Sequence, residues 1–144
     1  MNHQRMLLFM LLAVLLPGVG CKSTNEVTPT NPSEAASYEY SALDENGAVV
    51  ATGTLTLSFN GSAVTGYRDI KGNVPEAGTG NANGEMMSDG TIQIEIPGSI
   101  GIVILKGKLD GETLAGVRLL DTGGPAIDQR IGTFVAAPPG IGSH

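Results

Sequence analysis

A β-hairpin pattern that occurs twice, 50 residues apart, constrains the fold of this 144-residue chain more than any other feature. The copies are residues 53–68 and 103–118, and each alternates apolar and polar residues on both sides of a turn. The turns are Asn60-Gly61 and Asp110-Gly111, dipeptides that suit a two-residue type I′ turn because both central residues need positive φ. The sequence therefore predicts two equivalent antiparallel hairpins.

The same alternation and turn signals extend over the rest of the chain. They predict an all-β domain of eight strands, at residues 37–43, 48–59, 62–69, 78–87, 91–96, 100–109, 112–121 and 129–136. Consecutive hairpins favour an antiparallel up-and-down meander, and eight strands are enough to close a small barrel without exposed edges. We therefore expect a closed barrel over 37–137 with a disordered tail at 138–144, an open sheet or a sandwich being the alternatives.

The first 21 residues have the features of an export signal. Arg5 precedes an apolar run at 6–16, and Gly18-Val19-Gly20-Cys21 follows. This segment resembles the signal peptide and lipobox of bacterial lipoproteins, in which small residues precede a cysteine that is diacylated and becomes the mature N-terminus. The resemblance implies a signal peptide at 1–20, lipidation of Cys21 and, because Lys22 is not Asp, an outer-membrane location in the cell envelope. Ordinary signal-peptidase cleavage after Gly20 is the alternative.

Residues 22–36 form a polar segment rich in Pro, Ser and Thr, which lacks the apolar residues needed to offset the entropy of ordering. Together with Cys21 it is predicted to be a lipid anchor and flexible tether over 21–36.

Histidine and cysteine usage excludes several kinds of active site. The histidines are His3 and His144, at the two ends, and Cys21 is the single cysteine. The domain therefore cannot assemble a His/Cys zinc site, a Ser-His-Asp triad or an intramolecular disulfide. A net charge of −6 argues against a nucleic-acid partner. We therefore expect a protein that is not an enzyme and that uses no metal or cofactor.

The meander places the short turns at one end of the barrel and the longer loops 70–77 and 122–128 at the other. Loops of this kind carry recognition, so a ligand is expected to enter between them. The residues predicted to bind it are Arg68, Arg118, Arg130, Leu57 and Phe59. The arginines suit a carboxylate or another anionic head group, and the apolar pair suits its tail. Alternatively, the arginines pair with Asp69, Asp121 and Asp128 on the rim.

The predicted architecture is similar to that of calycin barrels such as lipocalins. This resemblance implies non-catalytic binding of a small apolar or amphipathic ligand by an exported, membrane-anchored lipoprotein. The alternative is a protein-interaction module, such as an envelope assembly factor or a hydrolase inhibitor, whose barrel is filled by its own side chains. Residues 100–109 are apolar on both faces, which predicts packing on both sides or an outer stripe for self-association.

Overall fold

The computed structural model describes residues 34–125 and 128–140. The predicted signal peptide, Cys21, most of the predicted tether and residues 141–144 lie outside this part of the chain. No helix in the described part is long and apolar enough to cross a membrane.

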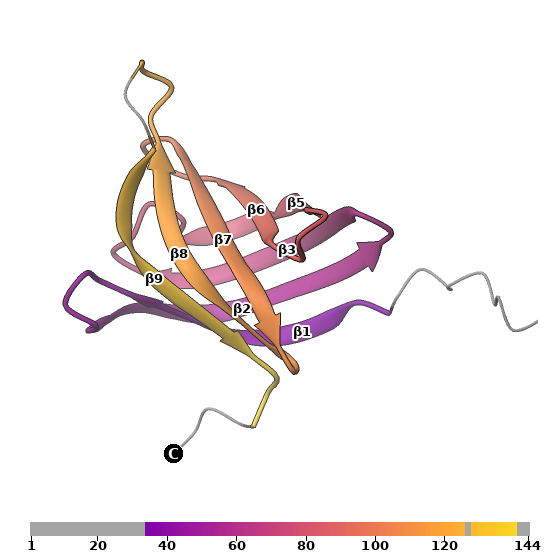
Figure 1. The fold of residues 1–144 in the computed structure, drawn as a ribbon. Coiled ribbons are helices and arrows are strands. Elements are labelled where there is room, and N and C mark those ends of the chain that lie inside the picture. Colours follow the sequence, from indigo (N-terminus) through magenta and orange to yellow (C-terminus); the bar gives the residue numbers. More distant parts are fainter. Residues whose placement is uncertain (1–33, 126–127, 141–144) are drawn as a thin grey trace, which may run out of the picture. The chain divides into compact units, whose positions relative to one another are not determined.

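The described residues form an antiparallel barrel in which strands adjacent in sequence pair with one another, except that β4 and β5 both pair with β3 (Figure 1). The strands are β1 (Ala36–Leu43), β2 (Val49–Asn60), β3 (Ala63–Gly72), β4 (Gly78–Asn81), β5 (Asn83–Met86), β6 (Ile92–Pro97), β7 (Ile102–Asp110), β8 (Thr113–Asp121) and β9 (Gln129–Ala137). Pairing of β1 with both β2 and β9 closes the ring. The predicted all-β, closed up-and-down barrel is therefore confirmed.

One predicted strand is divided in two. Within 78–87, β4 pairs with β3 near Arg68, whereas β5 pairs with β3 near Val64 and with β6. Between them Ala82 turns inward, is fully buried, and donates its N–H to the carbonyl of Gly66 at 3.0 Å. In the described part of the chain, β4 has a neighbour on one side only, so the barrel wall is interrupted between β4 and β6.

The predicted repeat is present in the strand register. Leu55 pairs with Arg68 in the β2–β3 hairpin, and Leu105 pairs with Arg118 in the β7–β8 hairpin. Going either way around the ring, three strands separate β3 from β8: β5, β6 and β7 in one direction, and β2, β1 and β9 in the other. The two hairpins therefore form opposite walls of the barrel, and Arg68 and Arg118 lie at equivalent heights on them.

The interior of the barrel is a packed apolar core. Leu55, Leu57 and Leu105 have no exposed surface, as the alternation in the two hairpins requires. The other large buried side chains come from every wall and include Tyr40, Ile70, Ile92, Ile94, Ile96, Leu114 and Phe134. Packing of this kind fills the interior of a small eight-stranded barrel.

Glycines let the strands approach one another and bend. At Gly53 in β2, an added Cβ would collide with the backbone of Asp69 and Ile70 on β3, so the close approach of these strands depends on glycine. Asn60 pairs with Ala63 and Asp110 pairs with Thr113, so the two-residue turns are Gly61-Ser62 and Gly111-Glu112, one residue later than predicted. Gly61 and Gly111 have φ of 61° and 62°, and no described residue other than glycine has positive φ. Positive φ at the first central residue alone is the pattern of a type II′ turn, so the predicted type I′ turns are wrong.

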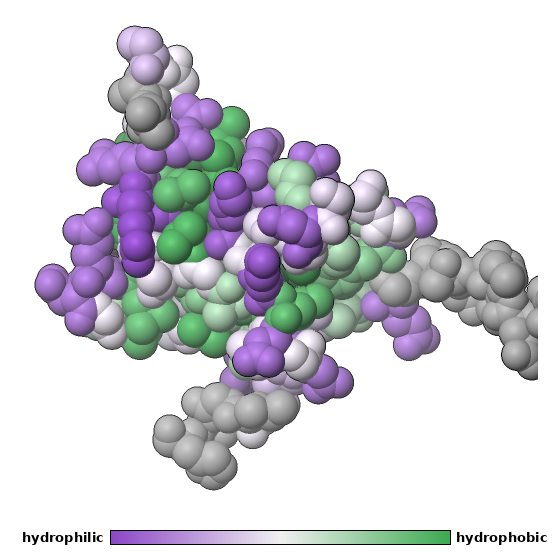
Figure 2. Space-filling view, viewed as in Figure 1, coloured by the Kyte–Doolittle hydropathy of each residue, from purple (hydrophilic) through white to green (hydrophobic). Residues whose placement is uncertain are grey.

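The outer surface of the barrel is mainly polar. Figure 2 shows apolar residues on the visible face as separate groups among polar side chains. On β7, Val103 and Leu105 point inward, Ile104 is 8% exposed, and Ile102 is 39% exposed. Packing thus covers Val103, Ile104 and Leu105, whereas Ile100, Ile102 and Leu109 remain exposed in the segment whose two faces are apolar in the sequence.

Candidate functional site

Three polar side chains meet inside the barrel, and each comes from a different segment. Arg118 of β8 is 2% exposed, Tyr40 of β1 is 1% exposed, and Glu76 of the β3–β4 connection is fully buried. The Arg118 Nε lies 2.7 Å from the Glu76 Oε1, and the Tyr40 hydroxyl donates to the same oxygen at 2.9 Å. The Arg118 Nη1 also donates to the backbone carbonyl of Leu43 at 3.2 Å. This arrangement is a buried, hydrogen-bonded ion pair.

Glu76 reaches this position because its segment folds into the long-loop end of the barrel. Gly72 and Gly78, with φ of 145° and 105°, stand on either side of the segment and allow the chain to turn in and out. The carbonyl of Pro75 accepts a hydrogen bond from the N–H of Ser99 at 3.0 Å, which ties the segment to the β6–β7 connection. Val74 packs against the core.

Tyr40 is held as a hydrogen-bond donor. Its burial, and secondarily the negative charge of Glu76, raise the pKa of the Tyr40 hydroxyl well above its usual range. The phenol therefore keeps its proton at neutral pH and directs it at the Glu76 carboxylate. The ring of Tyr40 also stacks on that of Phe134, with centroids 6.2 Å apart, which fixes its orientation.

Arg68 is the second guanidinium inside the barrel, and it is not part of this ion pair. Its side chain is 7% exposed, and its buried Nε has no hydrogen-bond partner among the described residues. The guanidinium lies over Gly80 of β4, where an added Cβ would be 3.9 Å from its Cζ and both terminal nitrogens. A second polar atom, the Glu76 Oε2, is also buried without a partner in the described part.

The structure brings some of the sequence-predicted residues together and leaves others apart. Arg68, Arg118 and Leu57 lie inside the barrel, and Phe59 packs against the edge of the core. Arg130 is exposed, because a register shift between Arg118 and Leu119 of β8 leaves Ile131 of β9 unpaired, and Ile131 packs against the core and interrupts the alternation. Arg118 pairs with Glu76 and not with an aspartate of the rim.

Glu76 and Tyr40 are the functional candidates that sequence reasoning missed. The available signal was charge balance, since two inward-facing arginines require a buried carboxylate. The connection at 73–77, flanked by glycines, is long enough to supply one.

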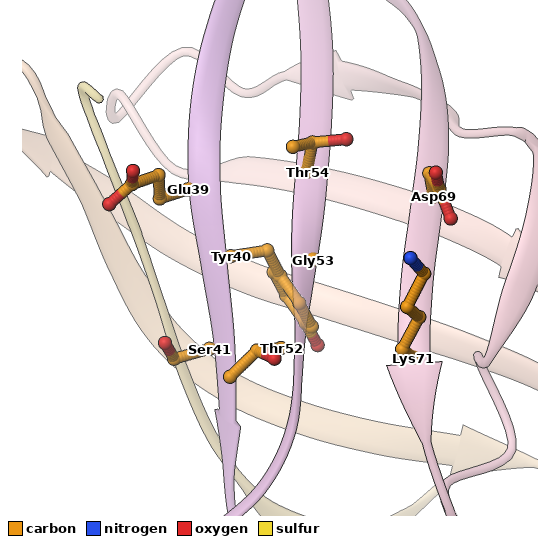
Figure 3. Close-up of a pocket in the computed structure, with 8 residues that line it drawn as sticks. All are labelled: Glu39, Tyr40, Ser41, Thr52, Gly53, Thr54, Asp69 and Lys71. Atoms are coloured by element: carbon orange, nitrogen blue, oxygen red, sulfur yellow. The ribbon is translucent and has the colours of Figure 1, made fainter. Parts of the chain in front are cut away.

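A pocket of about 510 Å³ lies on the outside of β1, β2 and β3 (Figure 3). One cross-strand row, formed by Glu39, Thr54 and Asp69, borders one side, and a second row, formed by Ser41, Thr52 and Lys71, borders the other. Its floor is the backbone around Gly53, whose cross-strand partners Tyr40 and Ile70 direct their side chains into the barrel. The pocket is therefore polar, with carboxylates on one side and an ammonium on the other.

The described residues contain no group of three or more His, Cys, Asp or Glu side chains that would hold a metal ion. No family model matches this chain, and no curated protein or solved structure is significantly similar to it.

Proposed function

We propose that this protein is an exported, membrane-anchored lipoprotein of the bacterial cell envelope whose barrel binds a small amphipathic carboxylate without chemical transformation. The observation that carries the proposal is the charge inside the barrel. Among the described residues, the buried charged side chains are Arg68, Arg118 and Glu76, so two guanidiniums face one carboxylate. An external anion would balance the remaining positive charge.

The physical argument rests on the cost of an unpaired buried charge. A guanidinium cannot lose its proton in a protein, so Arg68 cannot avoid the cost by becoming neutral. Desolvation of an unpaired ion costs several kcal/mol, and a carboxylate is the partner that arginine binds best, through two parallel hydrogen bonds. The 7% exposure of Arg68 leaves part of its side chain accessible from outside.

Two measurements test the binding function. Native mass spectrometry of the protein from its source cells should find a co-purifying acid. Titration with octanoate should show saturable binding, whereas octanol, which has the same chain without the carboxylate, should not bind. Failure of octanoate to bind at millimolar concentration, together with no co-purifying acid, would reject the proposal.

The anchor is tested independently of the ligand. Cells that express the protein are given a fatty-acid analogue, and Cys21→Ala is the matched control. Label in the wild-type protein and none in the variant supports lipidation, whereas an unlabelled wild type removes the anchor from the proposal.

The filled core and the outer pocket favour a second candidate, a protein-interaction module such as an envelope assembly factor or a hydrolase inhibitor. Here the polar rows around Gly53 would form part of the contact surface. The same native spectra distinguish the two functions, because a protein partner adds the mass of a polypeptide and a ligand adds that of a small acid.

A further inference from the structure

Arg68 and Arg118 form a pair related by the internal repeat. They are 50 residues apart, both are inward-facing, and each lies opposite a leucine on its partner strand. Because their hairpins form opposite walls of the ring, the two guanidiniums have equivalent starting positions in the barrel. A difference in their surroundings must therefore come from residues outside the repeat.

The Arg118 half of the pair already holds a carboxylate. Glu76 follows the first hairpin, crosses to the opposite wall, and places its Oε1 2.7 Å from the Arg118 Nε. The Tyr40 hydroxyl at 2.9 Å and the Leu43 carbonyl add further hydrogen bonds to this half, in which the Glu76 Oε2 has no partner among the described residues. A ligand carboxylate would have to displace Glu76 and these contacts to reach Arg118.

The Arg68 half has no such carboxylate in the described part of the chain. Glu76 stands eight residues after Arg68, and the residue eight positions after Arg118 is Ala126, which has no charged group and lies outside the described residues. Arg68 is more than nine-tenths buried, forms no ion pair with a described residue, and has an Nε without a partner among them. The pair is therefore charge-balanced on one side only.

We infer that Arg68 is the open half of this pair and accepts one carboxylate from an external ligand, while Arg118 is occupied by Glu76 and does not bind the ligand. This inference rests on the proposed function and assigns its binding site. It also fixes the stoichiometry at one carboxylate per protein. The filled core restricts what accompanies the carboxylate, so the rest of the ligand remains close to the interrupted wall beside β4.

The test follows the two arginine Nε–H signals by NMR in the Cys21→Ala protein, which carries no lipid and needs no detergent. Octanoate is the probe, and octanol is the neutral control. We expect octanoate to shift the Arg68 Nε–H signal and to leave that of Arg118 unchanged. Arg68→Met should weaken octanoate binding at least ten-fold. Lys106→Met, which removes an exposed cation from β7 away from the outer pocket, should leave it unchanged.

A second variant tests the symmetry of the pair. Glu76→Ala removes the resident carboxylate, so the stoichiometry should rise from one octanoate to two and both Nε–H signals should shift. If circular dichroism shows that a variant does not fold, the Arg68 and Arg118 Nε–H signals of the Cys21→Ala protein without further substitution decide the result.

Three outcomes would overturn the inference. Octanoate binding that survives Arg68→Met unchanged would place the site elsewhere while leaving the proposed function intact. A shift of the Arg118 signal with Glu76 present would mean that the ligand displaces Glu76. Absence of any octanoate binding would overturn this site, and it would remove the proposed function as well if no acid co-purifies with the protein.

Discussion

The buried ion pair makes its strongest prediction for Glu76→Leu. This change leaves the Arg118 guanidinium, 2% exposed, without its counter-ion. Removal of one partner from a buried pair typically costs about 3–5 kcal/mol, because the other charge remains desolvated. The Tyr40 hydroxyl loses its acceptor as well, which adds about 1 kcal/mol. Since small domains are stable by only about 5–15 kcal/mol, the variant should lose a large part of its stability.

The double variant Glu76→Leu/Arg118→Met separates this explanation from a simple loss of packing. Replacement of both members of a buried pair by apolar residues of similar size is often neutral or stabilising. The double variant should therefore be more stable than Glu76→Leu alone, although it carries one more substitution.

Urea unfolding followed by circular dichroism measures these differences as shifts of the midpoint at constant slope. In a thermal scan, about 3–5 kcal/mol corresponds to a fall in Tm of at least 12–20 °C, at about 4 °C per kcal/mol for a domain of this size. Glu95→Leu, at an exposed glutamate of β6, is the matched control and should change stability by about 0.5 kcal/mol or less. The reasoning is refuted if the effects of Glu76→Leu and Arg118→Met simply add, or if Glu76→Leu costs no more than the control.

Two further predictions concern pH and backbone packing. Because the pKa of Tyr40 is raised in the folded state, the unfolded chain loses this proton first as the pH rises. The contribution of Tyr40 to stability should therefore be complete below about pH 10 and should decline above it. Tyr40→Phe should reduce this decline in urea unfolding measured at several pH values, with Tyr67→Phe on the exposed side of β3 as the control. Gly53→Ala should destabilise the barrel by about 1–3 kcal/mol, because the added Cβ would collide with the backbone of β3. Gly124→Ala, with open space around the added carbon, is the control and should have little effect. Equal unfolding midpoints for the two variants would contradict the packing argument.

The sequence by itself determined the hairpins and their symmetry. Gly61 and Gly111 locate the hairpins, although the turns are Gly61-Ser62 and Gly111-Glu112, one residue later than predicted. Alternation on either side decides which residues face inward, so the burial of Leu57, Arg68 and Arg118 follows from local rules. The all-β class and the closed meander follow from the number and spacing of such segments.

The tertiary structure alone decided how the buried charge is balanced. The contacts of the cluster join residues 36, 42 and 75 positions apart, and no local pattern indicates that Glu76 crosses the barrel to Arg118 and Tyr40. The exposure of Arg130 likewise depends on a bulge, which shifts the alternation only once β8 and β9 have paired. Alternation and turns are properties of neighbouring residues, whereas the partner of a buried charge depends on which distant segments the closed ring brings together.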